Sequence, residues 1–154
     1  MNLALLRIAA LSLSLAAGAS FAADTAPAND KFTPARTKLA EKNWTAAIDE
    51  LKKVNDPASA EWNNLMGYSL RKADPVANAG EAEKFYNEAL RIEPRHRGAL
   101  EYSGELYLMT GNLAKAEERL AALDKACFLP CEEYTDLKKA VARYKAAGNK
   151  YVAQ

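Results

Sequence analysis

The sequence predicts an all-α protein, and three observations lead to this prediction. From Thr33 onward, apolar residues recur at three- and four-residue steps with charged residues between them, which is the spacing of amphipathic helices. No stretch alternates with a period of two for long enough to indicate a strand. Pro, Gly and Asn interrupt the pattern at short intervals, which leaves segments of about 10–15 residues. Helices of this length with short connections favour antiparallel pairs.

The composition of the chain argues against several classes of function. The 154-residue chain is 49% hydrophobic and 27% charged, as in ordinary globular proteins. Its 21 Lys and Arg residues against 20 Asp and Glu residues give a net charge of +1, which argues against nucleic-acid binding through bulk charge. One histidine and two cysteines leave few groups for a conventional metal or triad enzyme. We therefore expect a non-catalytic protein without a cofactor.

The first 22 residues have the pattern of a secretory signal peptide. Arg7 supplies positive charge, residues 8–17 form an apolar run, and the small residues Ser20 and Ala22 favour cleavage after Ala22. The alternative is a retained anchor, but the uncharged stretch at 8–23 has 16 residues and a spanning helix needs about 20. We expect a periplasmic or secreted protein with no membrane span after cleavage. Residues 23–32 would form a flexible lead-in.

The rest of the chain repeats itself. Ala47, Ala82 and Ala116 are separated by 35 and then 34 residues, and Gly67 and Gly104 are 37 residues apart. These residues recur in the same order within three helical segments, at about 33–57, 60–94 and 97–126. A fourth segment, at 132–147, has a single apolar stripe and would cap the last unit, and residues 148–154 would form a tail.

This pattern resembles the tetratricopeptide repeat, a helix–turn–helix unit of about 34 residues. The matches are clearest at residues 62–94 and 100–124, whereas the first unit lacks a glycine in its first helix. The resemblance implies antiparallel helix pairs that form a short α-solenoid. Gly67 and Gly104 would lie where the two helices of one unit approach closely. The aromatic residues expected to fill the spaces between units are Trp44, Tyr86 and Tyr107.

The resemblance also implies a binding surface for a protein or peptide partner. In this family the first helix of each unit lines the inner surface of the stack, which usually holds a peptide or another protein. The matching positions in this chain are Arg36 and Leu39 in the first unit, Asn64, Tyr68 and Arg71 in the second, and Glu101, Glu105 and Leu108 in the third. The carboxylate clamp of the chaperone-binding members is not expected, because Leu65, Gly98 and Tyr102 replace its polar residues.

Cys127 and Cys131 flank a bend, because Pro130 disfavours helix at the residue before it. In an exported protein this spacing favours a structural disulfide. Two alternatives remain open, a redox pair and a copper-binding pair, since a Cys-x-x-x-Cys pair resembles that of some periplasmic copper-assembly proteins. The third copper ligand could only be His96. The alternative function is therefore a periplasmic copper- or thiol-handling accessory protein.

His96 lies where the second unit meets the third, between Arg95 and Arg97. A catalytic histidine needs a nucleophile and an orienting partner, and no motif supplies them. We expect a solvent-facing histidine in a linker. The nearby arginines form a solvated turn or, as the alternative, contact an anionic partner.

Overall fold

The computed structural model describes residues 30–152. The predicted signal peptide and the start of the predicted lead-in lie outside these residues. The described part of the chain contains seven helices and no strand, which confirms the all-α prediction. The helices are α1 (Thr33–Ala40), α2 (Trp44–Val54), α3 (Ala60–Ala73), α4 (Ala79–Ile92), α5 (Arg97–Met109), α6 (Leu113–Ala126) and α7 (Glu132–Ala146).

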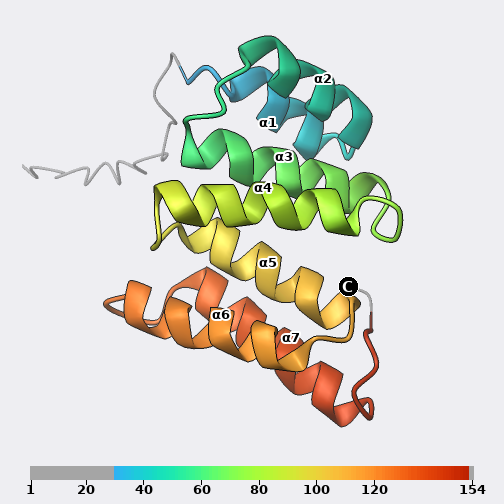
Figure 1. Ribbon diagram of the computed structural model, residues 1–154, viewed down its shortest axis with the longest axis vertical. Helices are drawn as coiled ribbons and strands as arrows, with labels where there is room; N and C mark the ends of the chain where they lie inside the picture. Colours follow the sequence, from blue (N-terminus) through green and yellow to red (C-terminus); the bar gives the residue numbers. More distant parts are fainter. Residues whose placement is uncertain (1–29, 153–154) are drawn as a thin grey trace, which may run out of the picture.

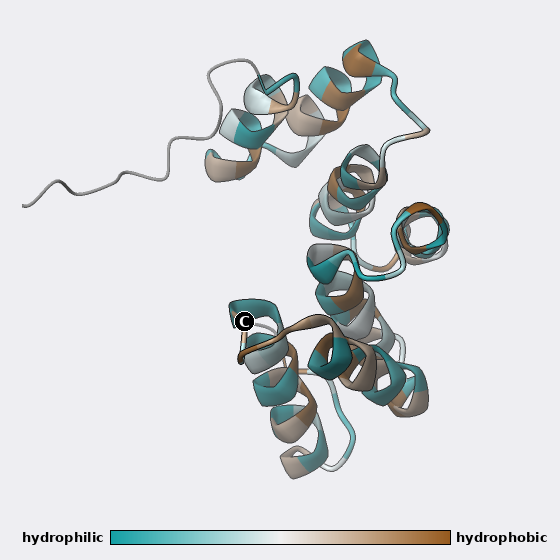
Figure 2. Cartoon of the chain, turned by 90° about the vertical axis from the view of Figure 1, so that its left-hand side faces the viewer, coloured by the Kyte–Doolittle hydropathy of each residue, from teal (hydrophilic) through white to brown (hydrophobic). Residues whose placement is uncertain are grey.

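The helices stack in chain order as antiparallel neighbours (Figure 1). Within the described residues, α1 packs on α2, α3 on α4, and α5 on α6. The successive pairs are joined through contacts of α2 with α3 and of α4 with α5, and α7 covers both helices of the last pair. Figure 2 shows that this stack follows an arc with one open side.

Local turn chemistry sets the helix ends. The side chains of Asn43, Ser59 and Asn112 accept hydrogen bonds from backbone N–H groups three residues later, which starts α2, α3 and α6. Asn55 ends α2 in the left-handed conformation. Gly111, at φ +78°, makes the tight turn between α5 and α6. These short connections hold each helix against its neighbour.

Two glycines allow close helix contacts, but not the same kind of contact. A Cβ atom on Gly67 would lie 2.8 Å from the ring of Tyr86, so this glycine lets α3 approach α4 of the same pair. A Cβ atom on Gly104 would lie 2.5 Å from Cδ2 of Leu137. The expectation that Gly104 lies at a close contact between the two helices of one unit is therefore wrong. Gly104 makes room instead for α7, whose Leu137 is fully buried.

The core has two parts. The smaller lies between α1, α2 and α3, and the larger runs from α3 to α7. Tyr86 is fully buried, and the hydroxyl of Tyr107 donates to Glu83 at 2.9 Å, which ties α5 to α4. None of the helices in the described residues is long and apolar enough to cross a membrane.

Candidate binding groove

Three cavities open along the inner helices and share their walls. The first, of about 340 Å³, lies between α3, α5 and the chain after α7. The second, of about 360 Å³, lies between α1, α3 and α5, and the third, of about 330 Å³, surrounds the start of α5. Tyr102 lines all three cavities. We refer to the three together as the inner groove.

The inner groove contains most of the residues that the resemblance implied. Seven of them line its cavities: Arg36, Leu39, Asn64, Tyr68, Arg71, Glu101 and Glu105. Leu108 is the exception, because its side chain is 1% exposed and belongs to the hydrophobic core. The expectation that Leu108 contacts a partner is corrected here. Its helix turns that position toward the neighbouring helices.

Aromatic rings form the middle of the groove. The rings of Tyr68 and Tyr102 lie 4.7 Å apart between centroids, and Trp44 meets Tyr68 edge-on at 6.2 Å. The guanidinium carbon of Arg71 is 5.6 Å from the centroids of both Tyr68 and Tyr102. A cation above an aromatic ring is attracted by its negative face, so Arg71 helps to fix both rings.

Arg71 is a buried charge with a specific partner. Nη1 of Arg71 lies 2.8 Å from Oε2 of Glu105, and the two side chains are 4% and 14% exposed. Burial disfavours the charged form of Arg71, but the nearby Tyr86 and Glu105 raise its pKa, so it stays protonated. Burial raises the pKa of the Tyr86 hydroxyl in spite of this positive charge. The ion pair links α3 to α5 beneath the groove.

Glu101 has a different environment. It is half-buried, and no hydrogen bond or salt bridge of its carboxyl group is present among the described residues. Burial and the negative charges of Glu105, Asp136 and Glu133 raise the pKa of Glu101 to about 8, although Arg71 opposes the shift. At neutral pH the wall of the groove therefore carries a carboxyl group that is mostly protonated.

In the cavity at the start of α5, several polar side chains contact Glu61. Its carboxylate is 3.0 Å from Nε2 of His96 and 2.5 Å from Nη2 of Arg36, and it accepts from Nδ2 of Asn64 at 3.2 Å. Burial raises the pKa of Glu61, but His96, Arg36 and Asn64 outweigh it and lower the pKa below the ordinary value. Oδ1 of Asn64 is buried and accepts no hydrogen bond within the described residues.

His96 does not face solvent as expected, because its side chain is only 13% exposed. Its Nδ1 accepts a hydrogen bond from the backbone N–H of Ala99 and so begins α5. This bond leaves the ring proton on Nε2, which then donates to Glu61. Both ring nitrogens are occupied by structural contacts, so His96 is not placed as a general base.

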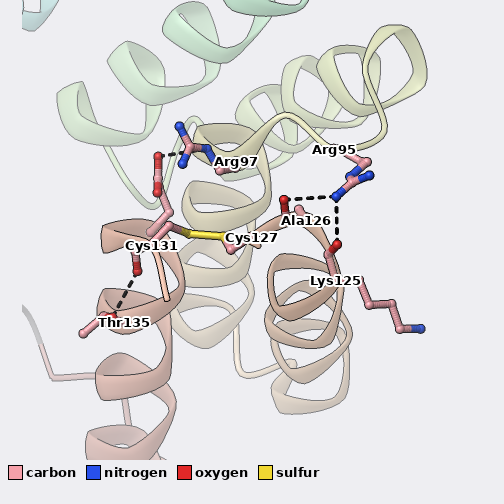
Figure 3. Close-up of a disulfide and its surroundings, with 8 residues drawn as sticks. Arg95, Arg97, Lys125, Ala126, Cys127, Cys131 and Thr135 are labelled. Atoms are coloured by element: carbon pink, nitrogen blue, oxygen red, sulfur yellow. Dashed lines mark hydrogen bonds and ion pairs between the residues drawn. A yellow bond between two sulfur atoms is a disulfide. The ribbon is translucent and has the colours of Figure 1, made fainter. Parts of the chain in front are cut away.

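The cysteine pair lies at the outer end of the last helix pair (Figure 3). A disulfide joins Cys127, at the end of α6, to Cys131, at the start of α7. Arg95 donates to the carbonyl oxygens of Lys125 and Ala126 at 2.9 and 3.1 Å, which holds the end of α6 against the α4–α5 connection. Within residues 30–152, no three His, Cys, Asp or Glu side chains are grouped to hold a metal ion.

Several residues that line the groove were not predicted from the sequence as partner contacts, among them Glu61, Tyr102 and Tyr151. Tyr102 shares its helix face with Gly98, Glu105 and Met109, so helical periodicity could have found it. Tyr151 also lines the first cavity, although it lies in the tail beyond α7. No sequence signal indicates that the tail returns to α3 and α5.

Comparison with models of known protein families found no match, and a search of curated proteins found no similar sequence. What the groove can do must therefore be judged from its geometry. It offers neighbouring tyrosines, an amide oxygen without a partner and carboxyl groups, which are groups that contact an extended chain.

Proposed function

We propose that this protein is a non-catalytic scaffold that binds a protein or peptide segment in the inner groove. One observation carries the proposal: three cavities with shared walls run across α1, α3 and α5, with Tyr102 common to all of them. Together they offer a long surface in place of a single enclosed pocket. An elongated ligand, such as an extended peptide, matches that shape better than a compact metabolite does.

The chemistry of the walls supports the same proposal. Tyr68 and Tyr102 provide large contact areas at low conformational cost, because each side chain has few rotatable bonds. The buried Arg71–Glu105 pair and the His96–Glu61 contact fix the helices that present them. A peptide would meet a surface that is already ordered, and ordering costs upon binding would be small.

The proposal includes the tetratricopeptide-type architecture. The paired helices, the arc of the stack and the glycines at helix contacts support it, as does the position of the groove on the first helix of each pair (Figure 2). It also includes export through the predicted signal peptide. Intact-mass analysis of the protein recovered from the cell envelope tests the export step, because the mature chain should begin at Ala23.

The alternative function, copper or thiol handling, requires free thiolates at Cys127 and Cys131. Both sulfur atoms are joined in a disulfide, and His96 is held by Ala99 and Glu61. These contacts support the groove as the functional surface and a structural role for the cysteines.

Selection of peptides from a random display library tests the proposal. We expect selected peptides to bind the wild-type chain, and Tyr68→Ala to weaken binding at least about fivefold, as for a residue at the centre of an interface. The matched control is Phe128→Ala, which removes a fully exposed aromatic side chain outside the groove. Peptides that lose binding in the Phe128 variant, and not in the Tyr68 variant, would contradict the proposal.

A further inference from the structure

Along the inner groove two acceptors lack a hydrogen-bond partner among the described residues, and the buried Nε of Arg71 is a donor without one. The carboxyl group of Glu101 has no hydrogen-bond or ion-pair partner among residues 30–152. Oδ1 of Asn64, a residue that is more than nine-tenths buried, accepts no hydrogen bond there either. The Asn64 amide cannot turn to exchange its atoms, because its Nδ2 already donates to Glu61. A ligand that completes the Asn64 amide oxygen and the ionised form of Glu101 must bring hydrogen-bond donors.

Two cations line the same cavity as Glu101, and each has a contact within the described residues. Arg71 pairs with Glu105 and lies against two tyrosine rings. Lys72 lies over the ring of Trp44, at 5.7 Å from its centroid. Near Glu101 an anionic ligand would meet further carboxylates.

The charges that face Glu101 come from three helices. Glu105 lies on the same helix, Glu133 and Asp136 come from α7, and Arg71 from α3 is the one opposing charge among them. The side chains of Tyr68, Tyr102 and Tyr151 and of Met109 line the same cavity of about 340 Å³. Aromatic side chains and carboxyl groups that line one cavity form the kind of surroundings that attract a guanidinium or ammonium group.

We propose that the inner groove selects segments with a basic side chain, and that the cation of this Arg or Lys side chain pairs with Glu101 in the cavity between α3, α5 and the tail. The inference rests on the proposed function and adds the chemistry of the ligand. The cation would bind the ionised form of Glu101, so the carboxyl proton is released as the complex forms.

Two small probes test this inference without a known partner. N-acetyl-argininamide and N-acetyl-citrullinamide have nearly the same shape, but only the first carries a positive charge. Titrated into the full chain and followed by amide chemical shifts, the arginine probe should bind about tenfold more tightly or better. The preference should grow about tenfold between pH 6.5 and 8.5, as Glu101 loses its proton.

The variant Glu101→Gln should lose the preference for the arginine probe at every pH. Its fold is expected to persist, because glutamine resembles the protonated carboxyl group already present at neutral pH. The matched control is Glu118→Gln, on the exposed side of α6, which should keep the preference. Equal binding of the two probes, no binding of the arginine probe, or an undiminished preference in Glu101→Gln would overturn the inference. The proposed function would survive these results if selected peptides without basic residues still bound the groove.

Discussion

Arg71 and Glu105 form a buried ion pair that joins α3 to α5, with 2.8 Å between Nη1 and Oε2. The pair spans two successive helix pairs, and its Arg71 lies against the rings of Tyr68 and Tyr102. It changes the expected role of Arg71, which the family resemblance placed at the surface as a partner contact. In the structure its first role is to hold the groove together.

Replacement of Arg71 should therefore destabilise the protein. Arg71→Met leaves the carboxylate of Glu105 in partly buried surroundings without its ion-pair partner, which typically costs about 3 kcal/mol or more. Thermal unfolding of the variant measures this loss. The exposed Arg97, which lies 3.6 Å from Glu133, provides the control, because Arg97→Met should change stability by less than about 1 kcal/mol. The double variant Arg71→Met, Glu105→Leu should recover much of the loss, and an Arg71 variant as stable as wild type would contradict this account.

Gly104 should tolerate no larger side chain. Gly104→Leu would drive its new atoms into Leu137, and overpacking of this kind costs about 1–3 kcal/mol, or more where neighbours cannot move. Hydrogen exchange should show the loss first in α7, the helix that Gly104 accommodates. Gly80, in the first turn of α4, has no neighbouring atom within 4 Å of its would-be Cβ. Gly80→Ala should therefore be neutral or stabilise the protein by about 0.5–1 kcal/mol. If hydrogen exchange in α7 is as slow in Gly104→Leu as in wild type, the close contact between Gly104 and Leu137 is not needed for stability.

The raised pKa of Glu101 has a consequence for stability. The folded protein keeps a proton on this group up to about pH 8, whereas the unfolded chain releases it near the ordinary value of about 4.3. Between these values the unfolded state binds fewer protons, so the contribution of Glu101 to stability falls as pH rises. At pH 8 the variant Glu101→Gln should melt several degrees or more above wild type, and near pH 4 the difference should vanish. A pH dependence that is identical in the two proteins would place the Glu101 carboxyl in ordinary solvent.

The disulfide should matter for stability and not for binding. It closes a short loop, and in the chain-entropy model its loss costs about 2 kcal/mol. The double variant Cys127→Ser, Cys131→Ser should melt at a lower temperature and still bind groove-selected peptides with unchanged affinity. If this variant folds as well as wild type but loses binding, the cysteine bend is the functional surface and the groove is not.

The helices could be predicted from the sequence, because the residues at which they begin and end are set by local interactions. Asn43, Ser59 and Asn112 cap helices through their own side chains, and Gly111 turns the chain by itself. Each of these signals acts within a few residues. Periodicity and turn residues therefore predict the element boundaries directly.

The parts that were not predicted depend on residues far apart in the chain. His96 meets Glu61 across 35 positions, and the burial of Arg71 depends on Glu105 in the next helix pair. Leu108 became a core residue because its face of α5 turns toward neighbouring helices. Tyr151 reaches the groove through the path of the tail. Sequence spacing shows which face of a helix is the more apolar, but it does not reveal which residues from distant parts of the chain come into contact.

Mapping a bound peptide by amide chemical shifts tests the central claim most directly. The tightest peptide from the display selection would be titrated into the isotope-labelled chain, and the perturbed residues located on the structure. We predict that the largest changes fall along the inner helices, at residues 61–72 of α3 and 98–109 of α5, and at Tyr151. Largest changes at residues 127–131, or on the outer helices α4 and α6, would contradict the claim that the inner groove is the binding surface.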